Sequence, residues 1–142
     1  MEDQHGHHLF QRHLEGSTGN ELELIVNQVA SLNQDKLLSL AIDTQGNYVV
    51  QHVLKLQNQE LTDKICNKLR GHYTDLSSKK DGSHVVKKWM TSSIKGMKYA
   101  VEEFLENGRS LGQLARDQYG NYVIQRALKT TKVIFPFSNS TH

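Results

Sequence analysis

The chain has 142 residues, of which 37% are hydrophobic and 23% charged, and its formal net charge is +2. This composition fits one globular domain or a short helical array, and it excludes collagen-like and low-complexity chains. The lone Cys66 excludes an internal disulfide, so a reducing compartment is expected: the cytoplasm, with the nucleus as the alternative. No apolar run approaches the roughly 18 residues that span a bilayer, and we expect neither a membrane span nor a secretory signal.

The charges are unevenly distributed along the chain. The first 78 residues contain six Lys and Arg against ten Asp and Glu, whereas the remaining residues contain eleven against five. The second half can therefore attract a polyanion, although Lys and Arg also simply solvate exposed helix faces.

A ten-residue motif recurs four times at a period typical of helical repeats. The copies are HGHHLFQRHL at His5, QGNYVVQHVL at Gln45, DGSHVVKKWM at Asp81 and YGNYVIQRAL at Tyr119. The second residue of each copy is Gly, and successive glycines are 40, 36 and 38 residues apart. Four such matches in register indicate one structural unit repeated along the chain.

Between the motifs the apolar spacing is helical, because apolar residues recur three or four positions apart. Long helices are predicted over 21–32, 60–69 and 97–105. Shorter helices are predicted to follow them over 36–42, 72–77 and 110–116. The motif forms the third helix of each unit. No segment alternates with a period of two, so the sequence gives a sheet little support.

The predicted fold is all-α, a right-handed superhelical solenoid of three-helix units that bury their apolar stripes against one another. The predicted boundaries are a partial first repeat with only the motif helix over 1–16, repeats over 17–57, 58–93 and 94–132, and an irregular C-terminal tail over 133–142. About three complete repeats meet the minimum for a stacked core.

A helical wheel divides the motif helix into a core face and an outward face. With Asn47 at zero, Gln51 lies about 40° away and Tyr48 about 100° away, while Val49 and Val53 lie on the opposite arc. Two amides one turn apart can hydrogen-bond a planar edge that offers a donor and an acceptor, and a tyrosine can stack on its face. The bases of single-stranded RNA expose such edges and faces. The alternative for any one helix is a solvated polar face.

The same trio recurs as Asn121, Tyr122 and Gln125, and at these residues the sequence resembles the Pumilio (PUF) family of RNA-binding repeat proteins. The resemblance covers roughly residues 2–130 and rests on the GNYVVQ motif in register with three-helix units. It implies the C-terminal half of an eight-repeat array, with the four copies corresponding to the fifth to eighth repeats. In that family each repeat reads about one base, and the RNA runs antiparallel to the protein.

The resemblance implies a role for three residues of each motif. The base-edge residues, one and five positions after the glycine, are His7, Gln11, Asn47, Gln51, Ser83, Lys87, Asn121 and Gln125. The base-stacking residues between them are His8, Tyr48, His84 and Tyr122. Basic residues near the motif helices are candidates for phosphate contacts: Arg12, Lys55, Lys88, Arg126 and Lys129.

The second and fourth copies carry the family's uracil combination, Asn and Gln around Tyr, whereas the other two depart from the pattern. His7 is not a usual residue at its position, which leaves the base read by the first copy open. Lys87 stands where the guanine combination of the family has Glu. Because Lys offers only donors, it cannot accept a hydrogen bond from a guanine edge. A base contact and a phosphate contact by Lys87 are equal alternatives.

Metal-dependent and catalytic functions find no support in the sequence. The N-terminal histidines do not form the i, i+4 pair that chelates from one helix face, and no Cys or carboxylate cluster completes a site. Cys66 lies in a core-like helix and is interpreted as a buried structural residue. The chain has no P-loop and no G-x-G-x-x-G motif. We therefore expect no enzyme, no metal and no cofactor.

The predicted function is sequence-specific binding of single-stranded mRNA, at elements that contain uracil, to control translation or decay. Two alternatives stay open. One is an adaptor that binds another protein, as armadillo and HEAT arrays do. The other is a truncated family member with weak or no RNA binding. Protein partners on the convex face of the solenoid are also left open.

Overall fold

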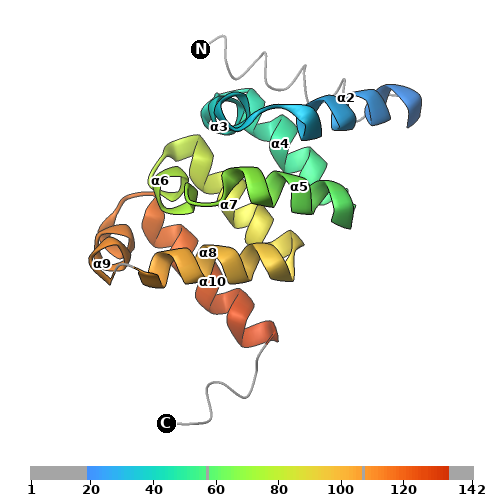
Figure 1. Cartoon of the computed structure of the whole chain (residues 1–142). Coiled ribbons are helices and arrows are strands. Elements are labelled where there is room, and N and C mark those ends of the chain that lie inside the picture. The colour runs from blue at the N-terminus through green and yellow to red at the C-terminus, as the bar shows by residue number, and fades with distance from the viewer. Residues whose placement is uncertain (1–18, 57, 107, 135–142) are drawn as a thin grey trace.

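The computed structural model describes residues 19–56, 58–106 and 108–134, which form nine helices and contain no strand (Figure 1). In chain order the helices are α2 (Gly19–Ser31), α3 (Gln34–Ile42), α4 (Gly46–Lys55), α5 (Gln59–Leu69), α6 (Tyr73–Ser77), α7 (Lys80–Ser92), α8 (Ile94–Glu106), α9 (Gly108–Arg116) and α10 (Gly120–Ile134). The all-α prediction is confirmed. Within the described ranges, no helix has the length and apolar character needed to cross a bilayer.

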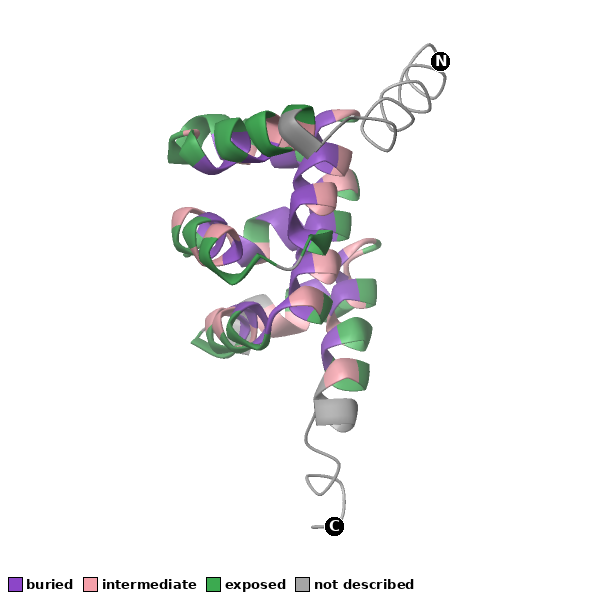
Figure 2. Ribbon diagram, turned by 90° about the vertical axis from the view of Figure 1, so that its right-hand side faces the viewer, coloured by how far each residue is buried: buried purple, intermediate pink, exposed green. Residues whose placement is uncertain are grey.

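The helices repeat in sets of three along the stack. The long helices α2, α5 and α8 lie one beneath another in Figure 1, with the shorter α3, α6 and α9 at one end of them. The motif helices pack in order, α4 against α7 and α7 against α10, and Figure 2 shows them in the column that leads to the C-terminal end. This arrangement is the helical-repeat solenoid that the periodicity predicts.

The predicted outer boundaries are only partly covered by the described residues. The partial first repeat over 1–16 lies outside them, as do residues 135–142. The structure extends α10 to Ile134, so the first two residues of the predicted tail are helical. Helical hydrogen bonding can continue for a few residues after the apolar periodicity that predicted the helix has ended.

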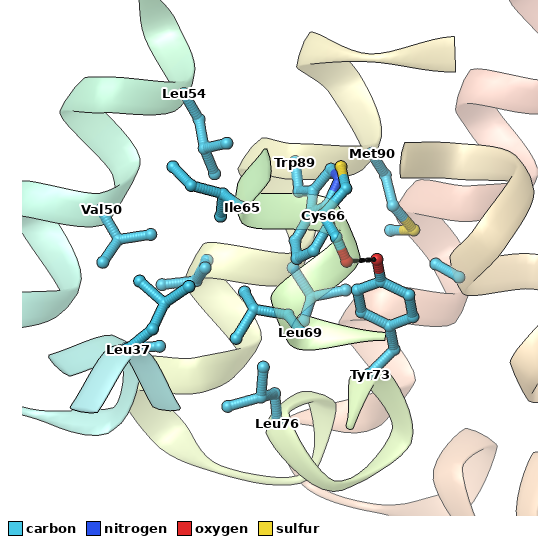
Figure 3. Close-up of a cluster of buried hydrophobic side chains, with 14 of the residues drawn as sticks. Leu37, Val50, Leu54, Ile65, Cys66, Leu69, Tyr73, Leu76, Trp89 and Met90 are labelled. Atoms are coloured by element: carbon cyan, nitrogen blue, oxygen red, sulfur yellow. Dashed lines mark hydrogen bonds between the residues drawn. The ribbon is translucent and has the colours of Figure 1, made fainter. Parts of the chain in front are cut away.

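A continuous core joins the units (Figure 3). At its centre the Tyr73 and Trp89 rings meet edge to face, with centroids 4.5 Å apart. The Tyr73 hydroxyl donates to the Cys66 carbonyl oxygen at 3.0 Å. Cys66 is fully buried, as predicted, and loss of hydration raises the pKa of its thiol to about 12.

The motif glycine is required because each motif helix begins directly against the preceding short helix. In all three described copies, a Cβ on this glycine would lie 2.6 to 2.7 Å from a leucine carbonyl oxygen. The pairs are Gly46 with Leu40, Gly82 with Leu76, and Gly120 with Leu114. A backbone atom cannot yield as a flexible side chain can, so only glycine fits and the register of the repeat is fixed there.

Charged side chains of one unit satisfy helix ends of the neighbouring unit. The Lys68 ammonium, from α5, donates to the carbonyl oxygens of Ala30 and Leu32 at the end of α2, the latter at 2.7 Å. The Glu103 carboxylate, from α8, accepts from two backbone N–H groups around the start of α6, each at 2.9 Å. These bonds supply partners for backbone groups that a helix leaves unpaired at its ends.

One apolar position of α10 is much more exposed to solvent than the equivalent positions of α4 and α7. Leu128 occupies the position of Leu54 in α4 and Met90 in α7. Leu54 is 0% exposed and Met90 is 1% exposed within the shared core, whereas Leu128 is 60% exposed.

Candidate nucleic-acid interface

An aspartate three residues before the glycine caps two of the motif helices. The Asp43 carboxylate accepts from the backbone N–H groups of Gln45 and Gly46 at 3.0 and 2.7 Å. Asp117 makes the same two bonds at 2.8 and 2.7 Å at the start of α10. The carboxylates partner unpaired N–H groups and lie at the positive end of the helix dipole. Our sequence analysis missed these residues, although the D-x-x-G spacing in both copies is a readable signal.

The Asn and Gln side chains of the second copy form one hydrogen-bonded chain. Asn47 Nδ2 donates to the carbonyl oxygens of Asp43 and Thr44, at 2.8 and 3.1 Å. Gln51 Nε2 donates to Asn47 Oδ1 at 2.9 Å. The Asn47 amide is thus used within the protein. Gln51 retains its carbonyl oxygen and its second amide hydrogen for an outside partner.

The fourth copy forms the same three hydrogen bonds as the second. Asn121 Nδ2 donates to the carbonyl oxygens of Asp117 and Gln118 at 2.7 and 3.1 Å, and Gln125 Nε2 donates to Asn121 Oδ1 at 3.0 Å. The same three bonds in two separate helices show that the motif sequence itself sets the orientation of the Gln amide.

The helical wheel placed Asn47 on the exposed arc, and for this residue the expected exposure is wrong. Asn47 is 0% exposed, Gln51 is half-buried, and in the fourth copy Asn121 is half-buried and Gln125 exposed. The side chain folds back onto the carbonyls of the preceding turn, which the wheel cannot represent. Base reading by these four residues stays a prediction.

The third copy has Ser83 and Lys87 in place of the hydrogen-bonded Asn and Gln. The Ser83 hydroxyl is buried and donates to the Lys80 carbonyl oxygen at 2.9 Å. Lys87 is half-buried, and its ammonium lies 5.8 Å from the centroid of the Tyr122 ring on the neighbouring helix. Partial desolvation, and then the nearby Arg126, lower the pKa of Lys87. The structure therefore brings Lys87 and Tyr122 together across two units.

The three described stacking candidates occupy equivalent positions on α4, α7 and α10. Tyr48 is half-buried, His84 is exposed, and Tyr122 is 56% exposed. Partial desolvation, followed by the positive charge of Lys87, lowers the pKa of His84. This shift favours the neutral imidazole, which suits stacking.

The structure describes most of the candidate phosphate contacts but none of the candidate residues of the first copy. Among the candidates for phosphate contacts, Lys55, Arg126 and Lys129 are exposed and Lys88 is half-buried. The predictions for His7, His8, Gln11 and Arg12 lie outside the described residues. In the part of the chain that the structure describes, no three His, Cys, Asp or Glu side chains could hold a metal ion together.

Comparisons with known proteins agree with this architecture. A family model described as a NOP9-like PUF repeat domain matches residues 2–109, and one described as a Pumilio-family RNA binding repeat matches residues 111–131. The chain is 40% identical over 131 residues to Pumilio homolog 12 of Arabidopsis thaliana, covering 92% of the chain and 21% of that protein. It is 36% identical over 128 residues to Pumilio homolog 11 of the same plant, covering 90% of the chain and 22% of that protein.

Solved structures show the same fold. The Puf3 RNA binding domain bound to the Cox17 RNA 3′ UTR recognition sequence site A matches with a TM-score of 0.75 and 29% identity, over 94% of this chain and 38% of that one. The Puf4 RNA binding domain bound to the HO endonuclease RNA 3′ UTR recognition sequence matches with a TM-score of 0.70 and 30% identity, over 89% of this chain and 39% of that one. The chain thus spans only about a fifth of the two Arabidopsis relatives and well under half of these solved domains. The repeat register, the three-helix units and these matches together establish that the chain belongs to the Pumilio (PUF) family of repeat proteins.

Proposed function

We propose that the chain binds single-stranded RNA in a sequence-specific manner along α4, α7 and α10, with uracil as the base read by the second and fourth copies. The observation that carries this proposal is the hydrogen-bonded chain that runs from the capping turn through Asn to Gln in both copies. It holds a Gln amide at the surface, one turn from a tyrosine ring.

The chemistry of the amide suits uracil. The Watson–Crick edge of uracil carries an N–H donor beside a carbonyl acceptor, and a primary amide offers the complementary acceptor and donor. The neighbouring ring supplies a stacking surface, and stacked bases are the usual way in which proteins hold single-stranded RNA. Two solved PUF domains with about 30% identity to this chain are described as bound to 3′ UTR sequences, which supports the same class of ligand here.

The proposed role is binding without catalysis, acting on messenger RNA in the cytoplasm to control its translation or decay. No step of this function needs a metal or a cofactor. The basic second half of the chain and the exposed cations Lys55, Arg126 and Lys129 suit the phosphate backbone, which dominates affinity in nucleic-acid complexes.

Fluorescence anisotropy with a short uracil-containing RNA tests the proposal. Stacking contributes about 1 to 3 kcal/mol per base, so Tyr48→Ala and Tyr122→Ala should each weaken binding about five- to 150-fold. Gln125→Glu should weaken binding as well, because a carboxylate can no longer donate to the base. Gln28→Glu is the matched control: it makes the same charge change at an exposed position on α2, outside the motif helices.

Two results would contradict base reading by these helices. One is unchanged RNA affinity in the double tyrosine variant. The other is an equal loss of affinity in the two Gln→Glu variants, which would mean that only the net charge matters.

A further inference from the structure

A groove of about 460 Å³ lies between the long helices α2 and α5, which Figure 1 shows one beneath the other. Leu22 and Val26 of α2 and Leu61 of α5 provide part of its apolar surface. Leu56, directly after α4, adds a side chain that is 41% exposed. None of the residues that line the groove is a base-edge or base-stacking candidate. The groove is therefore separate from the proposed RNA-binding surface.

Two exposed carboxylates flank this apolar surface, Glu23 on α2 and Glu60 on α5. Lys64 Nζ lies 4.0 Å from the Glu60 carboxylate, with 56% of the lysine side chain and 82% of the glutamate side chain exposed. An ion pair this long and this exposed contributes little free energy. The Glu60 carboxylate is thus available to a second cation, and the groove combines an apolar floor with an acidic rim.

The neighbouring gap, between α5 and α8, is bridged by an ion pair. Lys95 Nζ of α8 lies 3.4 Å from Asp63 Oδ2 of α5. Asn27 of α2 is the counterpart of Asp63, because the two are 36 residues apart, as are the motif glycines Gly46 and Gly82. The gap between α2 and α5 therefore has a neutral amide where the next gap has the carboxylate of the pair.

Glu60 is the counterpart of Lys95. Each lies two residues after the side chain that caps its helix, Asn58 in α5 and Ser93 in α8. The two capping oxygens accept from the backbone N–H three residues further on, at 3.2 and 3.0 Å. An amide and a carboxylate cannot form the ion pair that joins α5 to α8. A cation from outside the chain can approach Glu60 instead.

We propose that the groove between α2 and α5 binds a short segment of a partner protein in which a large aliphatic side chain lies close to a Lys or Arg. The aliphatic side chain covers Leu56 and Leu61, and the cation pairs with Glu60 and Glu23. Charge complementarity selects this partner, because the rim of the groove offers carboxylates on both of its helices. The inference does not depend on RNA binding, since it uses no base-reading residue of the motif helices.

Selection from a phage library of short random peptides against the full chain tests which segments bind. The enriched peptides should carry Lys or Arg within four positions of Leu, Ile or Met. Synthetic copies of them are then titrated by fluorescence anisotropy. The double variant Glu23→Gln with Glu60→Gln should weaken binding about two- to 30-fold, the range for two exposed ion pairs. The matched control, Glu102→Gln with Glu106→Gln, removes the same charge at exposed positions of α8 and should leave binding unchanged.

A second variant tests the apolar part of the groove. Leu56→Asn should weaken binding about three- to eightfold, in proportion to the exposed fraction of the leucine that the peptide covers. Leu105→Asn is its matched control, because it makes the same substitution at a leucine of α8 that is 61% exposed. Circular dichroism of each variant verifies that the helices remain.

The outcomes separate this inference from the proposed RNA binding. The inference is overturned if no peptide is enriched, if the enriched peptides lack a cation, or if groove and control variants bind them equally. A chain that sediments as a dimer, and that Leu56→Asn converts to a monomer, would make a second copy the occupant and overturn it too. Displacement of the peptide by saturating RNA would place the peptide on the motif helices, with the same consequence. A chain that binds the peptides and no RNA overturns the proposed function alone.

Discussion

Lys79 occupies the position of the capping aspartates in the one described unit that has no such cap, so a substitution there tests how the motif helices are anchored. Lys79 has an extended backbone (φ −109°, ψ 146°), close to that of Asp43 (φ −77°, ψ 142°). Its carbonyl oxygen accepts from the Ser83 N–H at 2.8 Å, as that of Asp43 accepts from the Asn47 N–H at 3.0 Å. The backbone is therefore already in the capping geometry and lacks only a side-chain acceptor.

Lys79→Asn should supply that acceptor and stabilise the chain. Asparagine caps about as well as aspartate, and it avoids repulsion from the nearby Asp75 and Asp81 carboxylates. The existing Lys79–Asp75 ion pair, at 3.7 Å and exposed, contributes little, so its loss subtracts at most a fraction of the gain. Relative to Lys79→Ala, which loses the ion pair without gaining a cap, the expected gain is about 0.5 to 2 kcal/mol.

Thermal unfolding followed by circular dichroism measures the difference. For a chain of this size, 1 kcal/mol corresponds to a Tm shift of roughly 4 °C. The converse change, Asp117→Ala, should lower the free energy of unfolding by a similar amount, because it leaves two backbone N–H groups without their carboxylate. Equal stability of Lys79→Asn and Lys79→Ala would refute the argument that these side chains anchor the motif helices.

Three further predictions concern packing, helix ends and pH. Gly82→Ala should destabilise the chain by about 1 to 3 kcal/mol, because its Cβ would overlap a backbone carbonyl. Gly112→Ala should stabilise the chain by about 0.5 to 1 kcal/mol, because no atom lies closer than 3.8 Å to the added Cβ. Urea unfolding of the two variants measures both changes. Lys68→Met should cost about 1 to 3 kcal/mol in the same assay through its two lost carbonyl partners, whereas the exposed Lys64→Met should stay within about 0.5 kcal/mol of the parent. Because the pKa of His84 is lowered, the unfolded chain binds more protons just below pH 6.5, so the free energy of unfolding should fall as the pH drops through that value; His84→Gln should remove this part of the pH profile.

The fold could be predicted from the sequence because its signals are local and repeated. Apolar spacing defined each helix to within a few residues, and the glycine register placed the motif helices. The reason for the glycine could not be predicted, because it depends on how close the Leu76 carbonyl of another helix comes to Gly82.

The candidate site was predictable only in its residue positions. The sequence identified Asn47 and Gln51 as neighbours on one face. It could not reveal that the Asn47 amide donates to carbonyl oxygens of the preceding turn, because helix and turn propensities do not specify side-chain hydrogen bonds. The contact between Lys87 and Tyr122 joins residues 35 positions apart and follows only from the packing of α10 on α7.

The exposure of Leu128 affects how much each motif copy can contribute to the affinity for RNA. In a stacked array each unit is stabilised by its neighbours, and local opening begins where neighbour contacts are fewest. Leu54 and Met90 are fully buried and Leu128 is 60% exposed, so we expect α10 to open most readily among the three described motif helices. Tyr122 and Gln125 lie on that helix. A ligand held by them must first offset the entropy of keeping α10 ordered, so we expect the fourth copy to contribute less net affinity than the identical residues of the second.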